Sequence, residues 1–346
     1  MKTTPKAPAT VVYHSADFDG IFCREIARRF LGDGGASYIG WNHGDAPLEV
    51  PAEGTIWILD LPADAPFGAK FDAMVPGLCR WPDGTDPARI IRFEDAMERM
   101  IWIDHHRTAI QSHPQRIPGY RIDGVAACRL AWQIFQDLRS AGMANLELLP
   151  KKADYGVALE EGGLSPYRVS EPLAVRLAGE YDVWDKHDPR AETLQYGLRC
   201  REISAEFWQA LLSESRDSRR AIEAALSAGA VAQSYATLEN AWVAKHRSFE
   251  LCWEGLRFLC LNTARCNSLS FGAALKPEHD GLLGFHFNGR HWRVSLYGVP
   301  HKPGIDLSAI AAKHGGGGHP GACGFTCAAL PFPAFSHEVS MDAVLR

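Results

Sequence analysis

The sequence predicts an α/β protein in which a doubly wound domain with a parallel sheet is joined by a helical connector to a smaller α/β domain. Three observations predict this class. Short apolar runs alternate with helical patterns in the first half of the chain. Those runs are apolar on both faces, which is typical of parallel strands covered by helices. Strand-like patterns return only after a long stretch that is poor in Gly and Pro and favours helices.

The domain limits follow from these changes of pattern. We predict 1–195 for the first domain, 196–248 for the connector and 249–346 for the second domain. Because ligands of open parallel sheets bind beyond the carboxyl ends of the strands, the functional site is expected at that edge of the first domain's sheet, and we place it in a cleft that faces the second domain.

The elements of the first domain follow from its apolar runs. Strands are expected at 11–14, 37–43, 55–61, 99–106 and 119–123. Helical spacing of apolar side chains predicts helices at 21–30, 125–138 and 171–187. Residues 62–98 contain five prolines and are interpreted as an insertion or a lid.

The second half begins with a mostly helical stretch at 201–248. Three strands are then expected at 257–262, 281–287 and 291–298. A short amphipathic helix at 306–314 precedes the sequence GGGGHPG at 315–321.

Composition limits the classes of function. The chain has 346 residues and a net charge of −5, which argues against long duplex DNA bound on a basic surface but allows a small anionic ligand. Nine scattered cysteines without a CxxC pair favour a reducing compartment. The N-terminal stretch lacks the apolar core of a signal peptide, and no apolar run reaches the about 20 residues that span a bilayer. We therefore expect a cytoplasmic protein without a membrane partner.

Acids and imidazoles follow three of the predicted strands. HSADFDG contains His14, Asp17 and Asp19, WILDLP contains Asp60, and DHH follows the fourth strand. In an open parallel sheet these segments are expected to converge, and carboxylate and imidazole groups bind divalent cations. The alternatives are an acidic turn that caps the next helix for HSADFDG and a turn acid for Asp60.

The DHH stretch comprises Asp104, His105 and His106. Adjacent side chains of an extended segment point to opposite sides, so the three groups are expected to have different partners. One imidazole binds metal, the other meets substrate, and the acid orients an imidazole from behind. The alternative is a pair of histidines in a surface loop. In YDVWDKHD, chemistry alone leaves Asp182 and Asp185 as equal candidates, and a polar helix end is the alternative to both.

The glycine block is the most unusual stretch of the second half. Four consecutive glycines allow positive φ and close approach of the backbone to a ligand, and successive N–H groups can bind an anion. Gly315 could end the preceding helix, but a helix end needs one glycine rather than four. We therefore expect a loop that turns its amides toward an anion, with His319 as a further donor.

These candidates together have the composition of a two-metal phosphoester hydrolase. Such an enzyme needs several carboxylates, a few imidazoles and a way to hold the phosphate. The ligand set without thiolate suits Mn²⁺, with Mg²⁺ or Co²⁺ as alternatives.

The motifs resemble those of the DHH phosphoesterase superfamily, in the branch with the DHH-associated C-terminal domain that includes nano-RNase-like oligonucleotide phosphodiesterases. The resemblance rests on HSADFDG, WILDL, IDHH and YDVW, and on VSLYG with DLSAIAAKHGGGGHPGACGF. It implies two metal ions, usually Mn²⁺, in the first domain and a glycine block that holds the substrate.

The resemblance also implies roles for individual residues. His14 and Asp17 would bind one metal, and Asp60 would bridge both. The second metal would be bound by Asp19, His105 and Asp182, where the pattern Asp-x-Trp selects Asp182. His106 would face the phosphate as a general acid with Asp104 as a supporting acid, whose contact with a metal stays open. Substrate contacts are expected from Gly316, Gly317, Gly318, His319, Arg293 and Ser295.

The implied activity is hydrolysis of short nucleotides by a hydroxide that bridges the two metals. Oligoribonucleotides, linear or cyclic dinucleotides and 3′-phosphoadenosine 5′-phosphate are the candidate substrates. One alternative is a catalytically silent nucleotide-binding sensor on the same fold. Another is a RecJ-type single-strand exonuclease, which would want a further nucleic-acid-binding domain and a basic groove. A homodimer is compatible with all of these.

Overall fold

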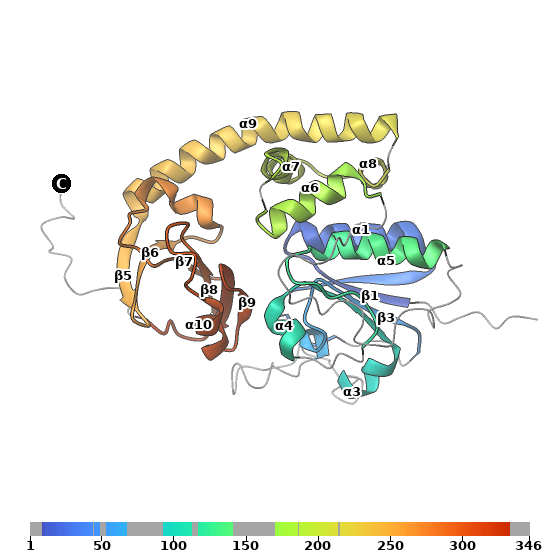
Figure 1. Ribbon diagram of the computed structural model, residues 1–346, viewed down its shortest axis with the longest axis horizontal. Coiled ribbons are helices and arrows are strands. Elements are labelled where there is room, and N and C mark those ends of the chain that lie inside the picture. Colours follow the sequence, from blue (N-terminus) through green and yellow to red (C-terminus); the bar gives the residue numbers. More distant parts are fainter. Residues whose placement is uncertain are drawn as a thin grey trace, which may run out of the picture. The chain divides into compact units, whose positions relative to one another are not determined.

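The structure is a computed structural model that describes residues 9–43, 45–48, 53–67, 93–112, 117–140, 170–185, 187–213 and 215–332 (Figure 1). Its described residues form two compact units, one with residues up to Ala236 and one from Thr237 on. The border falls inside helix α9 (Arg216–Arg247), within the connector predicted at 196–248. Most of the predicted 62–98 connection lies outside the described residues.

The predicted fold class is confirmed, since each unit is built on a sheet and the first sheet is parallel throughout. Its strand order is β2-β1-β3-β4. The strands are β1 (Ala9–His14), β2 (Ala36–Trp41), β3 (Ile56–Leu59) and β4 (Met100–Ile103). Because all four run in the same direction, the residues that follow them gather at one edge of the sheet.

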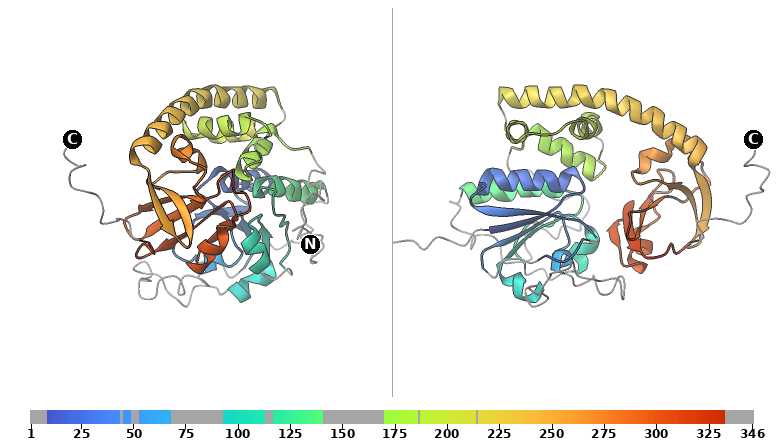
Figure 2. Two further views of the ribbon diagram at one scale, coloured as in Figure 1. Left: turned by 60° about the vertical axis from the view of Figure 1, so that its left-hand side comes forward. Right: turned by 180° about the vertical axis from the view of Figure 1, so that it is seen from behind.

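Helices cover both faces of this sheet (Figures 1 and 2). One face packs against α1 (Phe18–Leu31) and α5 (Ala127–Ser140), followed by α6 (Leu173–Asp182), α7 (Arg190–Arg199) and α8 (Ala205–Leu211). The other face packs against η1 (Ala65–Phe67), α3 (Phe93–Ala96), η3 (Met97–Arg99) and α4 (Arg107–Ser112). Strand residues alternate between the two cores as a pleated strand requires: Trp57 and Leu59 enter the first, Ile56 and Ile58 the second.

The fifth strand predicted at 119–123 is reduced to a single parallel bridge between Asp104 and Arg121. The segment still runs beside β4, since Trp102 N donates to Pro118 O at 2.8 Å. Pro118 has no N–H to return, and Gly119 has a φ of 134°, so a regular ladder does not form here.

The second unit contains a six-stranded sheet with the order β5-β6-β7-β8-β10-β9. Its strands are β5 (Phe249–Trp253), β6 (Leu256–Asn262), β7 (Gly281–Phe287), β8 (Trp292–Tyr297), β9 (Gly317–His319) and β10 (Ala322–Cys327). Only β6 and β7 pair in parallel. The 3-10 segment η5 (Ser268–Ala274) and helix α10 (Ser308–Lys313) complete the unit. Sequence pattern predicts β6, β7, β8 and α10, whereas β5, β9 and β10 are additional.

Among the described residues, no helix combines the length and the apolar character needed to cross a bilayer.

Candidate metal centre

The first ligands lie where β1 ends and α1 begins. His14 is the last residue of β1, and Asp17 caps α1 by accepting a hydrogen bond from Gly20 N at 3.2 Å. A Cβ on Gly20 would lie 1.9 Å from the carbonyl oxygen of His14, so only glycine allows the helix to start this close to the strand. The HSADFDG turn therefore caps a helix and also presents acids at the sheet edge. That these acids bind metal stays a prediction.

Asp19 is buried in the first turn of α1, with 2% of its surface exposed. Its Oδ2 accepts from Ala127 N at 2.8 Å and its Oδ1 from Cys128 N at 2.7 Å. These are N–H groups at the start of α5, where an anion is favoured. Two helices thus fix the position of this carboxylate.

Asp60 directly follows β3 and has a φ of 60°, in the left-handed region that few non-glycine residues adopt. Its backbone N donates to Ile103 O at 2.9 Å, which holds the turn against β4. Its side chain is buried, and Oδ1 accepts no hydrogen bond of regular geometry among the described residues, although His105 Nε2 lies 3.3 Å away. A strained backbone that carries a buried carboxylate oxygen is an observation that points to a functional site.

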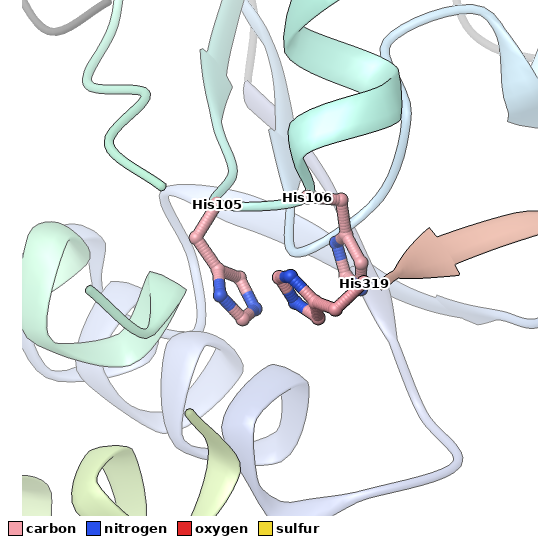
Figure 3. Close-up of side chains that lie close together, drawn as sticks. All are labelled: His105, His106 and His319. Carbon is pink, nitrogen blue, oxygen red and sulfur yellow. The ribbon is translucent and has the colours of Figure 1, made fainter. Parts of the chain in front are cut away.

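The DHH stretch turns sharply after β4 because Asp104 accepts hydrogen bonds from the two residues that follow it. Asp104 Oδ1 accepts from His105 N at 2.7 Å and from His106 N at 3.2 Å, and it lies 2.7 Å from His106 Nδ1. The rings of His105 and His106 lie 4.6 Å apart (Figure 3). The chain has left the extended conformation at this point, so both imidazoles lie on the same side.

Asp182 is the last residue of α6 and approaches the site from the helical layer. Its Oδ2 lies 3.2 Å from His105 Nε2. Asp185 instead pairs with His187, which is exposed. Of the two acids that chemistry leaves open, the structure brings Asp182 to the other candidate ligands.

The candidate ligands form two groups that share one residue. His14, Asp17 and Asp60 make up one group, and Asp19, Asp60 and His105 make up the other; in each, the ligand atoms lie within 4.8 Å of one another. Asp60 also groups with Asp104 and His106. Oxygen and imidazole nitrogen donors of this kind suit divalent cations such as Mn²⁺ or Mg²⁺, so these residues fit such a metal, and Asp60 is the residue that the groups have in common.

The electrostatics of the site support this fit. Burial and the negative charge of Asp60 raise the pKa of Asp19 to about 7. Burial, followed by the charge of Asp19, also raises the pKa of Asp182. For Asp60, burial acts upward, but the imidazoles of His105 and His14 outweigh it and lower the pKa. A buried group of carboxylates that draws protons and imidazolium charge toward itself is a place where divalent cations are stabilised.

For the imidazoles, burial and the nearby carboxylates shift the pKa in opposite directions. Burial acts to lower the pKa of His14 and His105, but the surrounding carboxylates outweigh it and raise both. Burial also raises the pKa of Cys23 and Cys128, which lie near Asp19, so both thiols stay neutral and do not act as thiolate ligands.

Sequence reasoning missed two supports of the ligands. One is the start of α5, whose backbone N–H groups hold Asp19 and leave no residue-type signal. The other is a network next to Asp182: Arg176 pairs with Glu180 and donates to Asp188 Oδ2 at 2.9 Å, and Asp188 N donates to Glu180 Oε2 at 3.2 Å. The spacing of four residues between Arg176 and Glu180 predicts an ion pair on a helix, but nothing in the sequence indicates that Asp188 joins them.

The expectation that the glycine block forms an open loop is wrong. Gly315 has a φ of 76°, and the bonds Gly315 N to Ala312 O (3.0 Å) and Gly316 N to Ala311 O (2.9 Å) end α10. Gly317 then begins the edge strand β9, which pairs with β10. The first two glycines of the block therefore end helix α10, and the last two belong to strand β9.

Close packing also explains two of these glycines. A Cβ on Gly316 would lie 2.0 Å from Gly324 O, and Gly318 has a φ of 129°. Arg293 and Ser295 lie on β8, where they pair with β10. That these glycines, His319, Arg293 and Ser295 contact a substrate stays a prediction.

Comparisons with known proteins add a likeness at low identity. No protein-family model and no curated protein matches the chain. A solved DHH domain, described as a member of the s1p family of ribosomal proteins, has 12% identity and a TM-score of 0.48, and 92% of this chain and 82% of that chain are covered. The pGpG-specific phosphodiesterase PggH from Vibrio cholerae has 13% identity and a TM-score of 0.37, with 93% of each chain covered. RecJ from Thermus thermophilus in complex with Mn²⁺ has 15% identity and a TM-score of 0.41, with 92% of this chain and 49% of that chain covered. At such values the function has to be argued from the residues of this chain.

Proposed function

We propose that the protein is a phosphoesterase of the DHH superfamily that uses two divalent cations to hydrolyse short nucleotides. The observation that carries the proposal is the position of Asp60, whose carboxylate belongs to two groups of candidate ligands at once. Two-metal phosphoester hydrolases need cations about 4 Å apart, and a shared carboxylate holds them at that distance. The four sequence motifs of the first unit contain the candidate ligands. The glycine motif of the second unit supports the branch with the DHH-associated C-terminal domain.

Each residue then has a chemical task. Manganese is the proposed metal, and cations at this position would polarise a phosphoryl oxygen and lower the pKa of water. His106 is 26% exposed and its Nδ1 faces Asp104 Oδ1, so Asp104 holds a proton on that nitrogen. Nε2 is then the atom that passes a proton to the leaving oxygen, which makes His106 the general acid.

The proposed substrates are short. A net charge of −5 fits a short substrate better than a long polynucleotide backbone. A dinucleotide, a short oligoribonucleotide or 3′-phosphoadenosine 5′-phosphate needs only a local anion site next to the metals. Every described cysteine is a free thiol, which supports a reducing, cytoplasmic compartment.

Turnover with Mn²⁺ tests the proposal. The panel contains oligoribonucleotides from two residues to long strands, cyclic dinucleotides and the bisphosphate nucleotide. His106→Gln should lower turnover of the best substrate at least about 100-fold while the bound Mn²⁺ stays the same. His291→Gln, in the turn between β7 and β8, is the matched control and should keep full turnover.

Two outcomes would redirect the proposal. Tight nucleotide binding without Mn²⁺-dependent turnover of any substrate would favour a silent sensor. Preference for long single strands over dinucleotides would favour a RecJ-type exonuclease. Near-normal turnover by His106→Gln would remove His106 from the reaction without touching the metal assignment.

A further inference from the structure

Helix α9 carries an exposed apolar stripe, which consists of four residues at intervals of four, three and four. Their exposed fractions are 74% for Val231, 69% for Tyr235, 74% for Leu238 and 50% for Trp242. This spacing is the heptad pattern that keeps side chains on one side of a helix. A soluble protein rarely leaves several large apolar side chains exposed in a row, so the stripe calls for a partner.

Helix α9 runs beside α7 (Figure 1), and one of its faces packs onto that helix. On that packed face, a Cβ on Gly229 would lie 2.0 Å from Thr193 O, and Thr193 Oγ1 donates to Gln233 at 2.7 Å. At 3.6 residues per turn, Val231 and Leu238 point nearly 180° away from Gly229. The stripe is therefore a second apolar face of the helix and not an extension of its core contacts.

Charge distinguishes the kinds of partner. Between residues 224 and 244, Glu239 is the single charged residue. Arg247 lies over the ring of Trp242, 5.7 Å from its centroid, so a cation flanks one end of the stripe. A nucleic acid or an anionic membrane would need Lys and Arg along the whole stripe, and residues 224–244 contain neither. Depletion of charge around aromatic and aliphatic side chains is typical of the centre of a protein–protein interface.

We propose that this stripe is the contact surface of a homodimer in which α9 packs antiparallel against α9 of a second copy. With the two-fold axis between Tyr235 and Leu238, Tyr235 faces Leu238 of the second copy. Val231 then faces Trp242 of the second copy, so a small side chain meets a large one at each end. A two-fold axis makes such a contact self-complementary.

The antiparallel direction follows from the charges that flank the stripe. In a parallel pair, Glu239 would face Glu239 of the second copy, and the cations Lys245 and Arg247 would likewise face their own counterparts. In the antiparallel pair the same cations lie opposite residues 226–228, which are uncharged. Like charges that face each other are unfavourable on paired helices.

The area is sufficient. The four exposed side chains offer about 500 Å² per copy, so two copies bury about 1,000 Å² before their polar neighbours are counted. That is the lower limit for a stable specific interface.

Sedimentation velocity of the full chain tests the proposal over loading concentrations from about 1 to 100 µM. We expect twice the chain mass of 38.1 kDa for the wild type. Leu238→Glu should weaken the dimer at least about 100-fold, because two carboxylates would be buried at its centre. Ala230→Glu is the matched control: it lies exposed on the same helix but outside the stripe, and should stay dimeric. Glutamate favours helices, and circular dichroism verifies that α9 is retained in both variants.

A mixing experiment tests the direction. Val231→Glu and Trp242→Lys should each be monomeric alone and should form a heterodimer when mixed, because position 231 of one copy faces position 242 of the other. A monomeric wild type at every concentration, or a dimer that Leu238→Glu leaves intact, overturns the proposal. So does Leu238→Glu selectively losing binding to a short RNA or to anionic vesicles, since the stripe would then serve that partner. A mixture that stays monomeric rejects the antiparallel register.

Discussion

Replacing Asp60 by Asn should remove both of the proposed metal ions, because the Asp60 carboxylate belongs to both ligand groups. Asparagine is the appropriate change, since residue 60 has a φ of 60° and Asn tolerates the left-handed region, whereas Ala would add backbone strain. Loss of a hydrogen-bonding partner behind a metal ligand costs up to 100-fold in affinity, so loss of the ligand itself should cost at least that for each ion. This corresponds to about 2.8 kcal/mol per ion.

Equilibrium dialysis against Mn²⁺, followed by measurement of metal per chain, checks this prediction. Asp17→Asn is the matched control. Asp17 belongs to only one ligand group, and Asn can replace Asp as the cap of α1. Asp17→Asn should therefore lose one ion and Asp60→Asn both. The reasoning is refuted if Asp60→Asn retains an ion at the Mn²⁺ concentration that saturates Asp17→Asn. It is also refuted if each variant loses one ion and keeps the other.

Three further predictions follow from local geometry. Gly20→Ala should destabilise the protein by about 3 kcal/mol in urea unfolding, because its Cβ would lie 1.9 Å from a backbone oxygen, whereas Gly34→Ala, which meets nothing within 4 Å, should change stability by less than about 0.5 kcal/mol. Asp188 has a lowered pKa because Arg190 donates hydrogen bonds to it, so its contribution is present above about pH 4 and is lost as pH falls toward the folded pKa. Asp188→Asn should therefore cost about 1–2 kcal/mol at pH 7 and less near pH 2.5, where the carboxyl of the unfolded chain is already protonated; an equal cost at both would be contrary to this account. Mn²⁺ at about 100 times its dissociation constant should stabilise the wild type by about 2.7 kcal/mol for each ion bound in thermal unfolding and leave Asp60→Asn unchanged.

The edge of the parallel sheet was predictable because two independent signals coincide there. Apolar runs locate β1, β3 and β4, and an acid or imidazole follows each run, so parallel topology alone brings His14, Asp60 and Asp104 together. Neither signal depends on a tertiary partner. The same reasoning could not choose between Asp182 and Asp185, because the choice depends on where α6 ends relative to His105.

The failures have a common physical cause. The glycine block was interpreted as an open loop because glycine's freedom is visible in sequence, but the strand that packs on Gly316 is not. The start of α5 holds Asp19 through backbone groups that every sequence possesses. Strand 119–123 failed because Pro118 and the positive φ of Gly119 interrupt the ladder beside β4. In each case the decisive contact is made by backbone that the residue types do not reveal.

The hydrogen bonds already made by each carboxylate indicate which acids are most available to a cation. Asp104 Oδ1 has three N–H or imidazole neighbours, which suits an acid that orients His106. Each oxygen of Asp19 accepts one backbone N–H and keeps a lone pair for a further partner. Asp60 Oδ1 is buried and accepts no regular hydrogen bond from the described residues, so a cation would complete its coordination at little reorganisation cost. The effect of Asp-to-Asn changes on metal content should therefore decrease from Asp60 to Asp19 to Asp104, while the effect of Asp104→Asn should fall on turnover, through His106. Equal metal loss in all three variants would show that the hydrogen bonds do not rank the ligands.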